Sequence, residues 1–267
     1  MLIDTHCHIH DSDYPLDTGE VISRAHQVGV MQMICIGTSD ENSRQAIEFA
    51  NSHDGIYASA GIHPHEASSG LGQLAEIIRF ATREDFSINS PAIPIHKLVA
   101  IGEIGLDYHY DNTSHDVQIQ LLTDQIRLAL NHNLPIIFHV REAFDDFWSV
   151  FDSFTSDGQQ IRGVLHSFTD TKENADEAIK RGLYIGVNGL STFTKNDSQK
   201  AMFAAIPLEK LLLETDAPYL TPAPFRGKVN EPAFVRQIAE FHGAIRQIPA
   251  DEVANITTAN ARALFNL

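Results

Sequence analysis

The 267 residues carry a formal net charge of −16; 43% of them are hydrophobic and 20% are charged. This composition is typical of a globular protein, and it excludes a disordered chain, a coiled coil and a nonspecific DNA-coating protein, which needs a basic face. The longest apolar runs are too short for a membrane span or a signal peptide, so we expect neither. The two cysteines, Cys7 and Cys35, are too few for a disulfide framework and favour a reducing, cytoplasmic location.

Short apolar runs alternate with helical patterns from one end of the chain to the other. We predict strands at residues 2–9, 30–37, 55–61, 98–103, 135–140, 163–166, 183–187 and 210–215. We predict helices near 18–28, 39–52, 71–84, 117–131, 142–154, 171–181, 197–205, 231–244 and 251–265, with a proline-containing loop at 87–96.

Nearly all of these strands are continuous apolar runs, which is typical of a parallel sheet covered by helices. Eight strand–helix units in a chain of this length predict an α/β fold of the TIM (β/α)8 barrel type. The competing architecture is an open doubly wound sheet, but no G-x-G-x-x-G turn follows the first strand. We find no linker or internal repeat and expect residues 1–267 to form one domain.

Histidines and acids stand at the carboxyl ends of the predicted strands. His6 and His8 lie two residues apart on the first strand, so their side chains share a face, on which Asp4 also lies. Two imidazoles on one strand face are natural ligands of one cation. Four further candidates each end a later strand: Glu103, His139, His166 and Asp216.

Each of these four residues on its own is as well explained as a helix cap, an ion pair or a core histidine. Together with His6 and His8 they place six nitrogen and oxygen ligands where barrel active sites are assembled. Such a set, with one carboxylate able to bridge, predicts a two-metal hydrolytic site. Neither a G-x-S-x-G elbow nor an activated cysteine offers a different catalytic centre.

Four segments make the resemblance to a known family specific. They are LIDTHCHI (2–9), AGIHPHEA (60–67), AIGEIGLDY (100–108) and LLLETDAP (211–218). In this order they resemble the motifs of the TatD-related deoxyribonucleases, which belong to the metal-dependent hydrolases with a TIM-barrel fold. The resemblance implies that one metal ion is bound by His6, His8, Glu103 and Asp216, and a second by Glu103, His139 and His166.

The reaction that follows is hydrolysis of a phosphodiester bond with two divalent metal ions (Mg, Mn or Zn). We expect a deoxyribonuclease with exonuclease-type action on single-stranded or end-bound DNA, with Asp216 holding and deprotonating the attacking water and Glu103 shared by the ions. Two alternatives stay open: a metallohydrolase of an ester or amide bond, such as an aminoacyl-tRNA deacylase, and a non-catalytic barrel scaffold. We expect no obligate protein partner.

Substrate contacts are predicted at four further positions. His63 and His65 follow the third strand and could bind phosphate or stabilise charge. Arg141 and Arg226 are candidate phosphate clamps, because the planar guanidinium engages phosphate through two parallel hydrogen bonds. For Arg141, pairing with a neighbouring surface acid is the alternative. The aromatic residues of segment 107–110 could stack a nucleobase.

Overall fold

The computed structural model describes residues 1–82, 97–110, 113–156 and 158–267. They divide into two compact units, the first made of Met1–Ile34 and Val164–Leu267 and the second of Cys35–Gly163. The loop predicted at 87–96 and the last two residues of the helix predicted near 71–84 lie outside the described residues.

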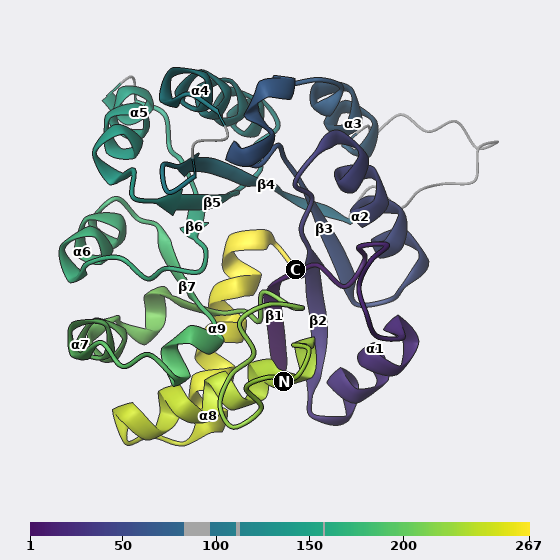
Figure 1. The fold of residues 1–267 in the computed structure, drawn as a ribbon, viewed down its shortest axis with the longest axis vertical. Coiled ribbons are helices and arrows are strands. Elements are labelled where there is room, and N and C mark those ends of the chain that lie inside the picture. Colours follow the sequence, from purple (N-terminus) through teal and green to yellow (C-terminus); the bar gives the residue numbers. More distant parts are fainter. Residues whose placement is uncertain (83–96, 111–112, 157) are drawn as a thin grey trace. The chain divides into compact units, whose positions relative to one another are not determined.

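The first unit contains both ends of the chain. Its strands are β1 (Leu2–Cys7), β2 (Val30–Cys35), β6 (Gly163–Leu165), β7 (Tyr184–Val187) and β8 (Leu211–Leu213), of which β2 and β6 each extend one residue into the second unit. Its helices are α1 (Thr18–Gln27), α6 (Lys172–Lys180), α7 (Asp197–Ala205), α8 (Val235–Arg246) and α9 (Ala250–Phe265), with short 3-10 turns η2 (Gly189–Thr192), η3 (Leu208–Lys210) and η4 (Pro232–Phe234) (Figure 1).

The second unit is built from consecutive strand–helix pairs. In chain order its elements are α2 (Asp40–Ser52), β3 (Ile56–Ala60), η1 (Pro64–Ser69), α3 (Leu74–Ala81), β4 (Leu98–Asp107), α4 (His115–Asn131), β5 (Ile136–Arg141) and α5 (Phe144–Ser156). Helix α2 begins with a side-chain cap, because the Ser39 side chain accepts a hydrogen bond from the backbone N–H of Asn42.

The strands form one eight-stranded sheet in the order β1 to β8. The ladders β3–β4, β4–β5, β6–β7 and β7–β8 are parallel, and an isolated parallel bridge between Cys7 and Ala217 joins the end of β1 to the segment after β8. Consecutive parallel strands, each followed by helix, with the end of the first strand bridged to the segment after the last, are typical of the TIM-barrel fold. The predicted fold class is therefore confirmed, while the single domain stays a prediction.

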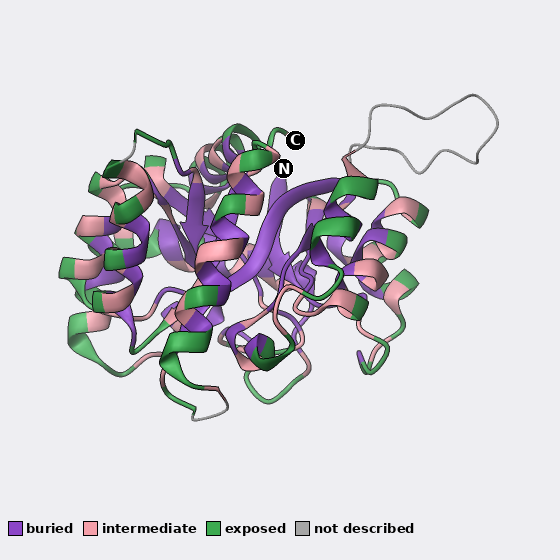
Figure 2. Ribbon diagram, turned by 90° about the horizontal axis from the view of Figure 1, so that it is seen from above, coloured by how far each residue is buried: buried purple, intermediate pink, exposed green. Residues whose placement is uncertain are grey.

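Burial follows the pattern expected of strands covered by helices. All six residues of β1 and all ten of β4 are buried, and Figure 2 shows the outer faces of the helices exposed. No helix among residues 1–82, 97–110, 113–156 and 158–267 is long and apolar enough to cross a membrane.

The fourth strand is longer than predicted, and this corrects the position of Glu103. We predicted that Glu103 ends the strand, but β4 continues to Asp107, so Glu103 lies in its interior. Glycines explain the extension: a Cβ atom on Gly105 would overlap the carbonyl oxygen of His139, and one on Gly61 would lie 2.7 Å from the carbonyl carbon of Gly102. Only hydrogen at these positions lets the backbones approach closely enough to continue the sheet.

Candidate metal centre

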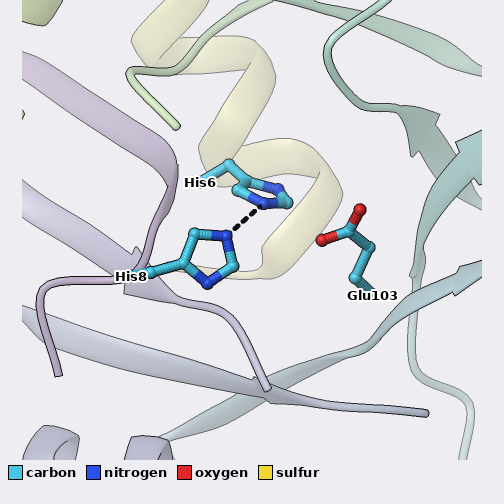
Figure 3. A group of neighbouring side chains, drawn as sticks. All are labelled: His6, His8 and Glu103. Atoms are coloured by element: carbon cyan, nitrogen blue, oxygen red, sulfur yellow. Dashed lines mark hydrogen bonds between the residues drawn. The ribbon is translucent and has the colours of Figure 1, made fainter. Parts of the chain in front are cut away.

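Three of the predicted ligands converge in the first unit. The Nε2 atoms of His6 and His8 lie 3.2 Å apart, and Asp216 Oδ1 lies 3.5 Å from each of them. Figure 3 draws the two rings with the hydrogen bond between them, together with Glu103 of the second unit. His6 is fully buried and His8 is 7% exposed, so both rings are largely removed from water.

The backbone fixes this trio at the ends of β1 and β8. The backbone N–H of Asp216 donates to the carbonyl of His6 at 2.8 Å, and the N–H of His8 donates to the carbonyl of Ala217 at 2.8 Å. Asp4, predicted on the same face, accepts hydrogen bonds from the backbone N–H and the hydroxyl of Thr215 at 2.8 and 2.5 Å. Asp4 therefore holds the β8 end in place.

Electrostatics distinguish Asp4 from Asp216. Burial raises the pKa of Asp4 to about 8, more than the hydrogen bonds from Thr215 lower it. Burial also acts to raise the pKa of Asp216, but the hydrogen bond from His8 and the charges of His6 and His166 outweigh it and lower that pKa to about 2. Asp216 is therefore the ionised carboxylate, as a metal ligand must be.

His166 directly follows β6 and stacks on His6, with ring centroids 3.9 Å apart. Its Nδ1 lies 3.5 Å from Oε1 of Glu214, a buried residue that also accepts a hydrogen bond from the backbone N–H of Ser167 at 2.5 Å. His6, His166 and Glu214 offer ligand atoms within 4.8 Å of one another. We did not predict Glu214; the available signal was an acid directly after the apolar run of β8.

The second unit holds its own converging group. Glu103 Oε1 lies 2.8 Å from Nδ1 of His139 and 3.5 Å from Nε2 of His63, and the ligand atoms of all three lie within 4.8 Å. Burial lowers the pKa of His63 to about 4, more than the Glu103 carboxylate raises it. A neutral imidazole can ligate a cation, but it brings no positive charge to a phosphate.

Asp107 is a second residue that we did not predict. Its Oδ2 lies 2.9 Å from Nε2 of His139 and 3.1 Å from Nε2 of His65. Burial acts to raise the pKa of Asp107, yet the hydrogen bond and charge of His139 hold it below its usual range. The available signal was spacing: Glu103 and Asp107 are four residues apart on one strand and so share a face.

Each group fits a divalent cation by its donor set. Imidazole nitrogen and carboxylate oxygen bind such ions at about 2.0–2.2 Å, so the ligands of one ion lie up to roughly 4.4 Å apart. The separations of 3.2 and 3.5 Å in the His6–His8–Asp216 trio lie inside this limit. In the Glu103–His139–His63 group, the ligand atoms lie within 4.8 Å of one another. Small side-chain movements would bring them within the same limit.

Arg141 and Arg226, the predicted phosphate contacts, are exposed. The aromatic residues Tyr110 and Tyr219 are exposed as well. The Arg141 guanidinium lies 5.3 Å from the ring centroid of Tyr110. The Arg226 guanidinium lies 3.7 Å from the ring centroid of Phe193. Tyr219, which is 60% exposed, lies three residues after Asp216, with its ring centroid 6.4 Å from that of His8.

Comparisons with known proteins identify the family of the chain. A family model described as "TatD related DNase" matches residues 3–266. The chain belongs to this family. It is therefore a metal-dependent hydrolase of the TatD type. It is 37% identical, over the full length of both chains, to the uncharacterized metal-dependent hydrolase YabD of Bacillus subtilis. It is 33% identical, again over the full length of both, to a protein of Erwinia tasmaniensis named 3'-5' ssDNA/RNA exonuclease TatD.

A solved structure supports the same assignment. The crystal structure of YJJV, a TatD homolog from Escherichia coli K12, matches with a TM-score of 0.87 and 30% identity, covering 100% of this chain and 98% of that one. The TatD assignment thus rests on the family model, on sequence relatives and on fold.

Proposed function

We propose that this TatD-family protein hydrolyses phosphodiester bonds with two divalent metal ions and acts as an exonuclease-type deoxyribonuclease on single-stranded or end-bound DNA. The ligands of the proposal are His6, His8, His166 and Asp216 in the first unit and Glu103 and His139 in the second. Glu103 is the proposed ligand of both ions, and Mg, Mn and Zn are the candidate metals.

The convergence of His6, His8 and Asp216 carries the metal part of the proposal. Two buried imidazoles and an ionised carboxylate within 3.5 Å of one another form a donor set that suits a divalent cation. The substrate part is supported by the Erwinia relative, whose name assigns it to single-stranded DNA and RNA.

The chain's own residues would divide the work of the reaction. Divalent ions bound at these ligands would supply Lewis acidity to the phosphoryl oxygens and lower the pKa of water. Asp216, ionised at neutral pH, would orient the attacking water and accept its proton. Tyr219 offers an exposed ring for a nucleobase beside His8.

Metal removal tests the proposal. The purified protein is analysed for bound metal, depleted with a chelator, and assayed with Mg²⁺, Mn²⁺ or Zn²⁺ on single-stranded DNA, duplex DNA, RNA and aminoacyl-tRNA. We expect depletion to abolish DNA cleavage and re-addition of a divalent cation to restore it, with the chain folded throughout, because a chain of this size has its own core.

A matched pair of variants sharpens the test. His8→Gln should lose bound metal and DNA cleavage, whereas His26→Gln, at an exposed position in the last turn of α1, should keep both. Full cleavage in metal-free protein would refute the metal mechanism. Hydrolysis of aminoacyl-tRNA without cleavage of DNA would instead identify an ester hydrolase. The cytoplasmic location and the absence of an obligate partner stay predictions.

A further inference from the structure

Asp107 joins two histidines of the second unit through one oxygen atom. It is the last residue of β4 and is 1% exposed. Its Oδ2 lies 2.9 Å from His139 Nε2 and 3.1 Å from His65 Nε2, while Oδ1 accepts a hydrogen bond from the backbone N–H of His109 at 3.0 Å. A buried carboxylate with this many donors is held in one orientation.

The main chain of Asp107 is fixed as firmly as its side chain. Gln118 of α4, also 1% exposed, accepts a hydrogen bond from the Asp107 N–H at 2.8 Å and donates one to the Asp107 carbonyl at 3.0 Å. The parallel register then aligns Gly105 with His139 and Asp107 with Arg141. Helix α4 and strand β5 together set where the carboxylate meets the imidazole.

The His139 ring lies between two carboxylates, with Nδ1 2.8 Å from Glu103 and Nε2 2.9 Å from Asp107. A carboxylate only accepts hydrogen bonds, so Asp107 requires a hydrogen on Nε2. Glu103 also only accepts, so without a metal ion Nδ1 carries a hydrogen as well; a cation bound at Glu103 would take the place of that hydrogen and leave Nε2–H on Asp107. The orientation of the ring and the choice of ligating nitrogen follow from the same contact.

We propose that Asp107 is a positioning residue that fixes His139 as a metal ligand through Nδ1. This inference rests on the proposed function, because it requires His139 to bind an ion. The role matches a general feature of metal sites, in which a ligating histidine donates its other ring N–H to a carboxylate and loss of that partner typically costs 10–100-fold in metal affinity.

Metal binding without substrate tests the inference. Metal-depleted wild-type protein and Asp107→Asn are titrated with Mn²⁺, and the free ion is counted by electron paramagnetic resonance. We expect Asp107→Asn to bind one of two ions about 10–100-fold more weakly, because a neutral amide is a weaker acceptor and can turn its NH₂ group toward the ring. The ion held by the His6–His8–Asp216 trio should keep its affinity.

A control and a second readout separate positioning from folding. Asp146→Asn changes a carboxylate of the same unit that accepts a hydrogen bond from the Tyr108 hydroxyl at 2.7 Å, and it should leave both affinities unchanged. Long-range ¹H–¹⁵N spectra of the Zn²⁺-loaded proteins, with His139→Gln used for assignment, should show Nε2–H and a metal-bound Nδ1 in wild type and a mixture of tautomers in Asp107→Asn.

The outcomes distinguish this inference from the proposed function. If wild type binds two ions and Asp107→Asn binds them equally well with an unchanged His139 tautomer, Asp107 is not a positioning residue. If wild type binds no ion, the proposed function itself is wrong. Should Asp107→Asn fail to fold, Asp107→Ala is tested with added formate: recovery of Mn²⁺ affinity with formate but not chloride supports the role, and no recovery overturns it.

Discussion

The buried imidazole of His242 should make the folded protein lose stability in mild acid. His242 lies on α8 and is 0% exposed, with Nδ1 2.8 Å from an Arg246 nitrogen and Nε2 3.1 Å from the Ser191 hydroxyl. A guanidinium only donates, so Nδ1 is the acceptor and Nε2 carries the hydrogen. Protonating Nδ1 would break this contact and place a second positive charge against Arg246.

The magnitude follows from the two states of this one group. Burial, aided by the Arg246 charge, lowers the pKa of His242 to about 3, whereas in the unfolded chain it is near 6.5. Below pH 6.5 the His242 side chain therefore binds a proton in the unfolded chain but not in the folded protein. The stability that is present above pH 6.5 is lost as the pH falls. Between pH 7 and pH 5 the loss is about 2 kcal/mol. Because pH 5 lies well above the pKa of His242 in the folded protein, the predicted loss depends mainly on its pKa in the unfolded chain.

Urea unfolding of wild type and His242→Gln at pH 7, 6 and 5, both metal-depleted, measures the effect. Glutamine can accept a hydrogen bond from Arg246 but cannot titrate. The contributions of all other ionisable groups therefore cancel when the unfolding free energies of the two proteins are subtracted. We expect the variant to be less stable by about 1–3 kcal/mol at pH 7, because its hydrogen bonds are poorer. That gap should shrink by about 2 kcal/mol at pH 5. Parallel losses in both proteins would refute the reasoning.

Three further predictions concern the proposed reaction. Asp216→Asn should lower kcat about 10²–10⁴-fold while single-stranded DNA still binds, and near-normal kcat with both metals bound would remove Asp216 from the chemistry. Tyr219→Ala should raise KM for single-stranded DNA roughly 5- to 150-fold, the effect of losing about 1–3 kcal/mol of stacking. Tyr184→Ala, at the amino end of β7, should leave KM unchanged. Because the net charge is −16, log Kd against log salt should have a shallow slope of magnitude about 1–3, reduced by roughly 0.7 in Arg226→Ala, whereas a magnitude near 6 would reveal a basic track.

Sequence patterns predicted the fold well because barrel strands leave a strong local signal. Runs such as Leu211–Leu213 are apolar on both faces, and caps such as Ser39 mark where helices begin. The end of β4 was predicted wrongly at Glu103, which Gly102 and Gly105 flank in the sequence. In three dimensions the same glycines allow close approach to β5, a tertiary effect that local propensity does not contain.

Only those parts of the candidate site that lie on one strand face could be predicted from the sequence, because strand periodicity is a local signal. The spacing of His6 and His8 predicted that their rings share a face, and their Nε2 atoms lie 3.2 Å apart. Asp107 went unnoticed because its role depends on meeting His139, which is 32 residues away. His63 was predicted to bind phosphate or stabilise charge, and that role stays a prediction; the burial that lowers its pKa to about 4 is not visible in the spacing. The bridging role of Glu103 stays a prediction.

The close approach at Gly61 and Gly105 limits which sequences can retain this site. Neither residue has a functional group, yet any side chain at Gly105 would displace the carbonyl of His139, and one at Gly61 would press on the backbone of Gly102 and Glu103. Loss of either glycine would therefore move a ligand without altering it. In a scan of all single substitutions, these two positions should tolerate as little change as the ligands themselves, and such intolerance would otherwise be mistaken for catalytic chemistry.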